Sequence, residues 1–176
     1  GRLRAHAVRG VGVGGVDADL SASHRRPPVV VVDDGGRTQQ VDFGHVGDID
    51  RVDPRVLTTL LEARFVPVIA SLAGDEDGRV YNVNADTVAE ALAVELRAQK
   101  LSILTGAPGV LRDRNDPSSL VTFADPDDLA DLMASGALAG GMRPKVEACI
   151  RAATGGVERT HIVDGRAPDA LLLEVF

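Results

Sequence analysis

The chain has 176 residues, of which 44% are hydrophobic and only 3% aromatic. This composition argues against a disordered chain and predicts one domain whose core is built from Leu, Val, Ile and Ala. A formal net charge of −7 argues against a nucleic-acid partner bound through a broad basic face. The short basic cluster at residues 24–26 is too small to reverse this balance, and we interpret it as a solvated loop.

Cys149 is the single cysteine, so an internal disulfide is excluded and a reducing cytosol fits. We expect it to be a small core residue on a helix. No apolar run reaches membrane-spanning length, and the first residues are not typical of a signal peptide. The sequence therefore predicts a cytoplasmic protein that does not bind a membrane.

The first third of the chain predicts short strands and one helix. Residues 11–13 form a strand, and the glycines at 14–15 make a turn or let another backbone come close. A β-branched run, a glycine turn and an alternating run predict a hairpin over residues 29–42. Residues 43–50 read as a loop. Asp53 followed by a proline is a helix start, and that helix runs to about residue 63.

A continuous apolar run at residues 65–72 predicts a strand buried on both faces. The acidic, glycine-bounded residues 74–78 that follow predict a solvated hairpin loop. They lack the spacing and the closing glutamate of an EF-hand calcium loop.

The segment 81–87 alternates polar and apolar residues and then changes to helical spacing, which continues to about residue 98. Asn82 and Asn84 are expected to face one way on an extended lead-in. Thr87 and Glu90 have capping-box spacing, with Asp86 as the alternative cap. A helix start offers unpaired N–H groups that suit anions, so an anion site and an ordinary capped helix both remain open interpretations.

The second half continues the alternation of strands and helices. A short apolar strand at 101–104 is followed by a sharp loop at 105–109. Asp125 and its following proline start a helix that ends at Gly136. A further helix covers about residues 142–153. Strands are predicted at 161–164 and 171–176.

This alternation predicts an α/β protein with a mainly parallel sheet. Ligands bind such sheets beyond the carboxyl ends of the strands. The loops predicted at that edge are residues 14–15, 71–74, 105–109 and 164–166. Without an internal repeat or a low-complexity linker, we expect residues 1–176 to form a single domain.

Lys145 lies in the first turn of a helix that follows two glycines. A cation there opposes the helix dipole, so it indicates either a phosphate-binding lysine or a surface lysine that reaches into water. The sequence contains no Walker A motif, nucleophile elbow or protein-kinase catalytic loop. The four histidines lack metal-ligand spacing, so no metal site is predicted, and nothing supports Cys149 as a nucleophile.

Six segments in order along nearly the whole chain resemble the N-acetylglutamate kinases of the amino-acid-kinase superfamily. The most specific are Asn-Val-Asn-Ala-Asp at 82–86 and Gly-Gly-Met-Arg-Pro-Lys at 140–145. The remaining matches are at residues 41–48, 65–69, 105–111 and 161–166. The family's N-terminal part and extreme C-terminus find no counterpart in residues 1–176.

The resemblance implies an incomplete three-layer α/β/α sandwich around a mainly parallel sheet. It implies ATP-dependent phosphorylation of the γ-carboxylate of N-acetyl-L-glutamate, the second step of arginine biosynthesis, by an enzyme that is a homo-oligomer at full length. Lys145 would stabilise the transferring phosphoryl group and Asp86 would organise the catalytic groups. Asn82 would bind acetylglutamate and Asn84 would support the site. Mg²⁺ is implied with ATP. The resemblance places these residues at the nucleotide site: Thr105, Gly106, Ala107, Pro108, Gly109, Val110, Leu111, Ala137, Leu138 and Ala139.

The chain also departs from the family pattern. Gly106 stands where the family usually has aspartate, which removes a polar contact expected at the nucleotide. A glycine-rich phosphate loop and an acceptor clamp belong to the family's missing N-terminal part, so residues 1–176 alone are not expected to phosphorylate acetylglutamate. Two alternatives remain: a kinase for carrier-protein-linked aminoadipate in lysine biosynthesis, and a non-catalytic remnant or regulatory binding module.

Overall fold

The computed structural model describes residues 5–32, 35–138 and 140–175. They divide into two compact units, with the boundary between Val88 and Ala89 inside helix α3 (Ala85–Glu95). The single domain expected from the sequence stays a prediction. Within the described ranges, no helix combines the length and the apolar character needed to cross a membrane.

The first unit contains a parallel pair of strands. Strand β1 (Gly10–Gly14) pairs with β6 (Val66–Ala70), with Gly10 opposite Val66. Helix α2 (Arg55–Glu62) packs on β6. It starts where predicted, because the carboxylate of Asp53 accepts a hydrogen bond from the Arg55 backbone N–H at 3.1 Å.

The expectation that residues 65–72 form one strand buried on both faces is wrong. Strand β6 ends at Ala70, and a separate strand β7 (Leu72–Gly74) follows. Val66 and Val68 are 45% and 52% exposed. An apolar run shows that a segment forms a strand, but burial of both faces depends on what packs against it. In the described part of the chain β6 is covered on one face only.

A four-stranded mixed sheet completes the body of the first unit, in the order β5 (Gly47–Val52), β2 (Ser21–Arg25), β7, β8 (Val80–Asn82). Strand β2 runs antiparallel to β5 and parallel to β7, and β7 is antiparallel to β8. The loops predicted at 43–50 and 71–74 are therefore partly wrong, because pairing with β2 turns their polar or glycine-rich residues into strands.

The glycines at the end of β1 behave as predicted. A Cβ on Gly15 would lie 1.7 Å from the carbonyl oxygen of Leu72, so only glycine allows the two backbones to approach. The 3₁₀ turn η1 (Asp17–Asp19) then leads into β2. The basic cluster at 24–26 is solvated but lies partly on β2, where His24 Nδ1 lies 2.7 Å from the Asp50 carboxylate and Arg25 forms an ion pair with Asp42.

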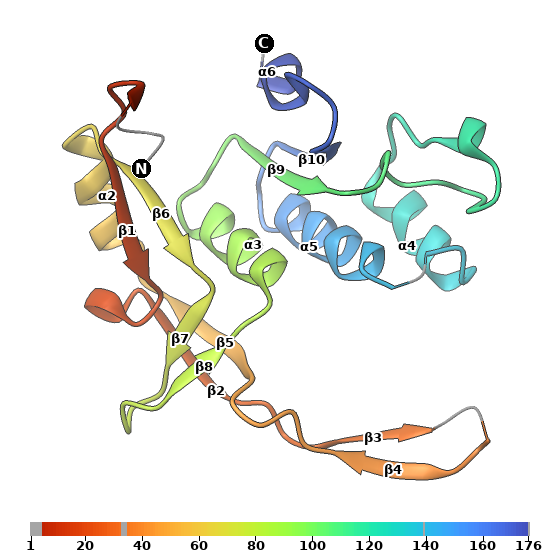
Figure 1. The fold of residues 1–176 in the computed structure, drawn as a ribbon, viewed down its shortest axis with the longest axis horizontal. Coiled ribbons are helices and arrows are strands. Elements are labelled where there is room, and N and C mark those ends of the chain that lie inside the picture. The colour runs from red at the N-terminus through yellow and green to blue at the C-terminus, as the bar shows by residue number, and fades with distance from the viewer. Residues whose placement is uncertain (1–4, 33–34, 139, 176) are drawn as a thin grey trace. The chain divides into compact units, whose positions relative to one another are not determined.

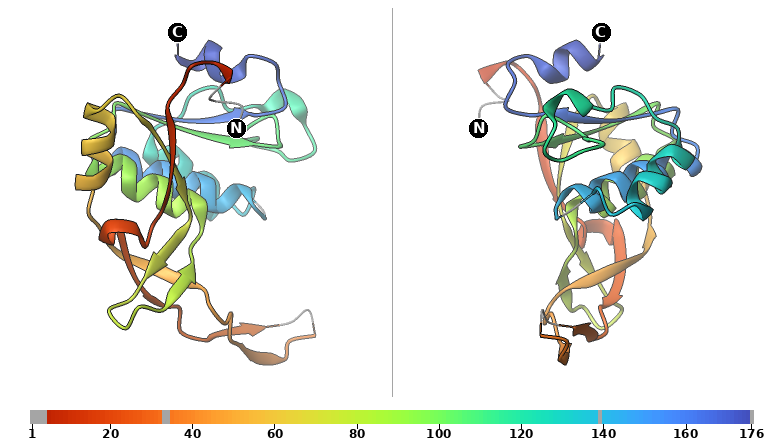
Figure 2. Two further views of the ribbon diagram at one scale, coloured as in Figure 1. Left: turned by 60° about the vertical axis from the view of Figure 1, so that its left-hand side comes forward. Right: turned by 90° about the vertical axis from the view of Figure 1, so that its right-hand side faces the viewer.

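The predicted hairpin is confirmed. Strand β3 (Val29–Val32) pairs antiparallel with β4 (Thr38–Val41), and the turn contains Gly36 at φ +75°. The hairpin extends beyond the four-stranded sheet of its own unit (Figures 1 and 2).

The second unit is built on a parallel pair of strands, β9 (Lys100–Thr105) and β10 (Arg159–Asp164). Helix α5 (Met142–Thr154) packs on both strands, and α4 (Pro126–Ala134) packs on α5. The 3₁₀ turn η2 (Pro117–Ser119) precedes α4. As predicted, α4 begins at a cap in which the Asp125 carboxylate accepts from the Asp128 N–H at 2.8 Å.

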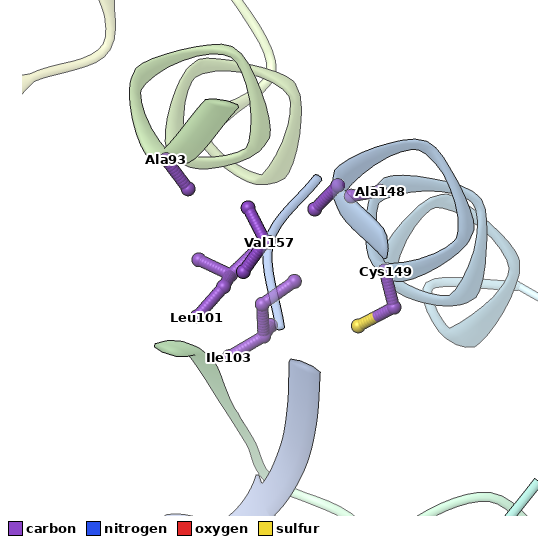
Figure 3. Packing of buried hydrophobic residues seen from close by; sticks show 7 residues of the cluster. Ala93, Leu101, Ile103, Ala148, Cys149 and Val157 are labelled. Atoms are coloured by element: carbon purple, nitrogen blue, oxygen red, sulfur yellow. The ribbon is translucent and has the colours of Figure 1, made fainter. Parts of the chain in front are cut away.

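The core of the second unit lies between its strands and helices. Leu101 and Ile103 of β9 pack against Ala93 of α3 and Cys149 of α5 (Figure 3). Cys149 is 3% exposed, which confirms that it is a core residue on a helix.

The last predicted strand is wrong, because residues 170–175 form helix α6 (Ala170–Val175). Its three consecutive leucines are strong helix formers, whereas strands favour β-branched and aromatic residues. Two polar contacts hold the helix end to the strands: the Lys100 ammonium donates to the Glu174 carbonyl at 2.5 Å, and His161 Nδ1 lies 2.7 Å from the Glu174 carboxylate. The α/β class itself is confirmed, with a parallel ladder in each unit.

Candidate functional site

The polar segment that links β8 to α3 has the alternation predicted for it. Tyr81 and Val83 are 4% and 3% exposed, whereas Asn82 and Asn84 are exposed. The backbone of Asn82 is fixed by its N–H, which donates to the carbonyl of His45 at 2.8 Å. The two asparagine side chains therefore lie on the solvent side of a well-anchored backbone.

Neither predicted cap of α3 is correct, because Asn84 caps the helix. Its side-chain oxygen accepts hydrogen bonds from the backbone N–H groups of Asp86 at 2.9 Å and Thr87 at 3.2 Å. Its backbone carbonyl accepts the first helical bond, from the Val88 N–H at 3.0 Å. The helix thus begins at Ala85, earlier than the capping-box spacing indicated, and Asp86 lies half-buried in its first turn. Asparagine is among the best N-caps, and that preference was the available signal.

The acidic loop before β8 is a hairpin turn, as predicted. The Asp75 carboxylate accepts from the Tyr81 hydroxyl at 2.7 Å and from the backbone N–H groups of Asp77 and Arg79 at 3.0 and 2.9 Å. The Tyr81 hydrogen bond is the main reason that the pKa of Asp75 is lowered, against the opposing effect of burial. This carboxylate fixes Tyr81, which immediately precedes the exposed asparagine.

In the second unit, two predicted loops meet at the carboxyl ends of β9 and β10. Thr105 lies opposite Asp164 in the ladder, and the Gly165 N–H donates to the Thr105 carbonyl at 2.8 Å. The side chain of Arg166, followed by its backbone N–H, lowers the pKa of Asp164 to about 2. These contacts fix both loops at the edge where parallel sheets bind ligands.

An apolar cluster gathers the predicted nucleotide segments of the second unit. Val110, Leu138 and Val146 are 7%, 7% and 0% exposed and pack together. Residues 105–111 and 137–138 therefore lie near the start of α5, where Lys145 precedes Val146. The side chains of Val110 and Leu138 therefore face the core of the second unit. Ala139 lies outside the described residues.

Lys145 occupies the first turn of α5, where it is half-buried. The helix follows Gly140, at φ +58°, and Gly141 at the N-cap position, neither of which has a side chain to cap it. Backbone N–H groups and a nearby ammonium are an arrangement suited to a phosphate group.

The predicted site residues fall on both units. Asn82, Asn84 and Asp86 belong to the first, and Lys145 belongs to the second with the nucleotide loops. The roles given to these residues stay predictions. In the part of the chain that the structure describes, no group of three His, Cys, Asp or Glu side chains is placed to hold a metal ion.

The sequence did not indicate a cavity of about 720 Å³ in the second unit. It is lined by residues of the α4 start, α5, β10 and α6, and shares only Val110 with the predicted nucleotide site. His161, one of the four histidines without metal-ligand spacing, lies at its wall with Nδ1 2.7 Å from the Glu174 carboxylate.

Comparisons with known proteins add an independent observation. The model of the amino acid kinase family matches residues 1–164. The acetylglutamate kinase of Myxococcus xanthus (strain DK1622) is 53% identical over 175 residues, covering 99% of this chain and 57% of that protein. The chain thus spans little more than half the length of the curated relatives it matches.

Solved structures show the same fold. The N-acetylglutamate synthase of Neisseria gonorrhoeae, complexed with coenzyme A and N-acetyl-glutamate, superimposes with a TM-score of 0.77 at 26% identity, over 99% of this chain and 37% of that one. The carbamate kinase of Giardia lamblia, bound to AMP-PNP, superimposes with a TM-score of 0.65 at 17% identity, over 97% and 66%.

Proposed function

The chain belongs to the amino acid kinase family, and on this premise we propose that it forms the larger part of an ATP-dependent acetylglutamate kinase. The reaction is transfer of the γ-phosphoryl group of ATP to the γ-carboxylate of N-acetyl-L-glutamate, in arginine biosynthesis. The observation that carries the proposal is the 53% identity to the Myxococcus xanthus acetylglutamate kinase across 99% of the chain. The two most specific motifs, at 82–86 and 140–145, lie inside this match.

Phosphoryl transfer needs alignment of donor and acceptor and stabilisation of developing charge, with little covalent chemistry by the protein. Lys145 would supply that charge from the first turn of α5. The loops at 105–111 and 137–139 would hold the nucleotide, with Val110 and Leu138 contributing through their backbones. Their buried side chains, 7% exposed each, support this division.

On the acceptor side, Asn82 would bind acetylglutamate through its exposed amide, and Asp86 would organise the catalytic groups. Mg²⁺ would arrive with ATP as part of the substrate, held chiefly by the phosphates. The proposal includes a cytoplasmic location, in keeping with the single cysteine, and a homo-oligomeric enzyme at full length.

A chimera tests this function directly. Residues 1–176 would replace the matching portion of the Myxococcus xanthus enzyme, and ATP turnover would be measured with acetylglutamate and with carrier-protein-linked aminoadipate. We expect turnover that depends on acetylglutamate and stays within about a hundredfold of the parent enzyme, since a misalignment of the reactants by about 1 Å can cost that factor. A folded chimera that binds ATP but phosphorylates neither acceptor would overturn the proposal, and preference for the carrier-linked acceptor would reassign the substrate.

A further inference from the structure

We propose that Asn84 is a positioning residue, which fixes Asp86 by capping α3, and that it does not contact the acceptor. The inference rests on the proposed function for the role of Asp86. It gives a physical reason for distinguishing two asparagines that are both exposed and face the same side of the segment.

The side-chain oxygen of Asn84 is already engaged. It accepts from the N–H groups of Asp86 and Thr87, at 2.9 and 3.2 Å. An amide oxygen has two lone pairs, so these two bonds use its acceptor capacity. A substrate N–H that approached this oxygen would have to displace a capping bond, and the start of α3 would lose a partner.

Asn82 is held in another way. Its backbone pairs with Leu72 of β7 and donates to the His45 carbonyl at 2.8 Å. Backbone pairing on β8 therefore fixes its position, and its side chain is exposed at the end of the strand. The exposed side chain of Asn82 is therefore placed to contact a ligand, whereas the side chain of Asn84 is placed to hold the start of α3.

The cap acts on Asp86 through the backbone. Asp86 is the second residue of α3, and its own N–H is one of the two bonded groups. Holding this N–H sets the backbone angles of the first turn and hence the direction in which the half-buried carboxylate leaves the helix. Small displacements of a group that aligns reactants cost large factors in rate, so a frayed first turn should lower turnover.

Substitution by aspartate distinguishes support from contact. Asn84→Asp keeps a side-chain oxygen that caps a helix as well as asparagine does, and Asn84→Ala removes it. A new carboxylate repels an anionic acceptor more strongly the closer it lies, so the rise in KM should be larger at a position that contacts the acceptor than at one that only supports the site. Asn82→Asp, two residues earlier on the same side, is the matched control, and we expect it to raise KM for acetylglutamate about tenfold or more.

In the chimera, we expect Asn84→Asp to raise KM less than Asn82→Asp does and to keep a higher kcat than Asn84→Ala, because the cap survives. Asn84→Ala should lower kcat about tenfold with KM changed less than about twofold. A rise in KM for Asn84→Asp that matched the rise for Asn82→Asp would overturn the proposal, and so would equal kcat for the Asp and Ala variants.

Amide hydrogen exchange keeps the test independent of catalysis. In the 176-residue chain, the N–H groups of Asp86 and Thr87 should exchange about fivefold faster in Asn84→Ala and at the parent rate in Asn84→Asp. Unchanged exchange in Asn84→Ala would refute the cap even if the chimera were inactive. An inactive chimera with the expected exchange pattern would instead count against the proposed function, leaving the cap established.

Discussion

The two segments that carry the proposed chemistry are held by different forces. Residues 82–87 are fixed by hydrogen bonds to single atoms, from Asn84 to the helix start and from Asp75 to Tyr81. The nucleotide-side segments in the second unit are fixed by burial of Val110, Leu138 and Val146. One segment depends on particular polar atoms and on their protonation, and the other depends on side-chain volume.

This difference shows whether the residues proposed to act on the substrate are also the residues that stabilise the fold. At the start of α5, function and stability are assigned to neighbouring residues, since Lys145 is proposed to act on the phosphoryl group while Val146 is 0% exposed. In residues 82–87 the two roles fall on the same short segment, because the atoms that fix the backbone lie beside those proposed to act on the substrate. The experiments below vary one force at a time.

The largest effect is expected for Lys145→Ala in the chimera. Loss of a cation where charge develops in the transition state should lower turnover about a hundredfold or more, with little change in KM for acetylglutamate. Arg143→Ala is the matched control, because this side chain, 59% exposed, pairs with Glu147 on the same helix. Equal turnover for the two variants would remove Lys145 from the chemistry.

Val146→Ala should mainly change stability. The deletion of two buried methyl groups is expected to lower the free energy of unfolding by about 2 kcal/mol, measured by chemical denaturation. The loss should be the same at pH 7 and at pH 3, since the cluster carries no charge. Val68→Ala, at a site 52% exposed, should cost less than about 0.5 kcal/mol. Similar losses at the two sites would contradict the burial argument.

Gly106→Asp should improve ATP binding by about 0.5–1.5 kcal/mol, the value of one added hydrogen bond. The resemblance places a carboxylate here, and no atom lies within 4 Å of the position that a Cβ would take, so there is room for it. Gly106→Ala adds the Cβ alone and should leave affinity unchanged. Calorimetry that found weaker binding for the aspartate variant than for the alanine variant would reject the predicted contact.

Asp75→Asn should give the smallest change and the one that depends on pH. The pKa of Asp75 is lowered, chiefly by the Tyr81 hydroxyl, so the carboxylate stabilises the fold above its unfolded pKa of about 3.9. That contribution is lost as pH falls through the lowered value. The melting midpoint of Asp75→Asn should therefore lie below the parent at pH 7 and approach it at the acid end.

Two controls sharpen this measurement. Tyr81→Phe should remove much of the pH-dependent difference, because it deletes the main cause of the shift. Asp77→Asn, at a side chain 68% exposed in the same turn, is the matched control, because it leaves the hydrogen bond between Asp75 and Tyr81 in place. A gap between parent and Asp75→Asn that stayed constant with pH would show that the carboxylate charge does not stabilise the hairpin.

Local signals in the sequence determined much of this protein. The α/β class, the hairpin at 29–42 and the helices that begin after Asp53, Asp125 and Gly141 follow from turn residues, caps and periodicity, which act over a few neighbours. The family followed from motifs whose order along the chain is visible without coordinates. Burial of Cys149 followed from the tendency of a free cysteine to be a small core residue.

Other features could be seen only in the tertiary structure, because they depend on contacts between residues that are distant in sequence. Strand β5 exists through pairing with β2, and the exposure of Val66 and Val68 depends on what covers β6. Asn84 caps α3 in place of the two expected candidates because of where β8 ends. That end is set by the His45 and Ser71 carbonyls, which accept from the Asn82 and Val83 N–H groups. Several polar residues have a high propensity for the N-cap position, and the position of the preceding strand decides which of them caps the helix.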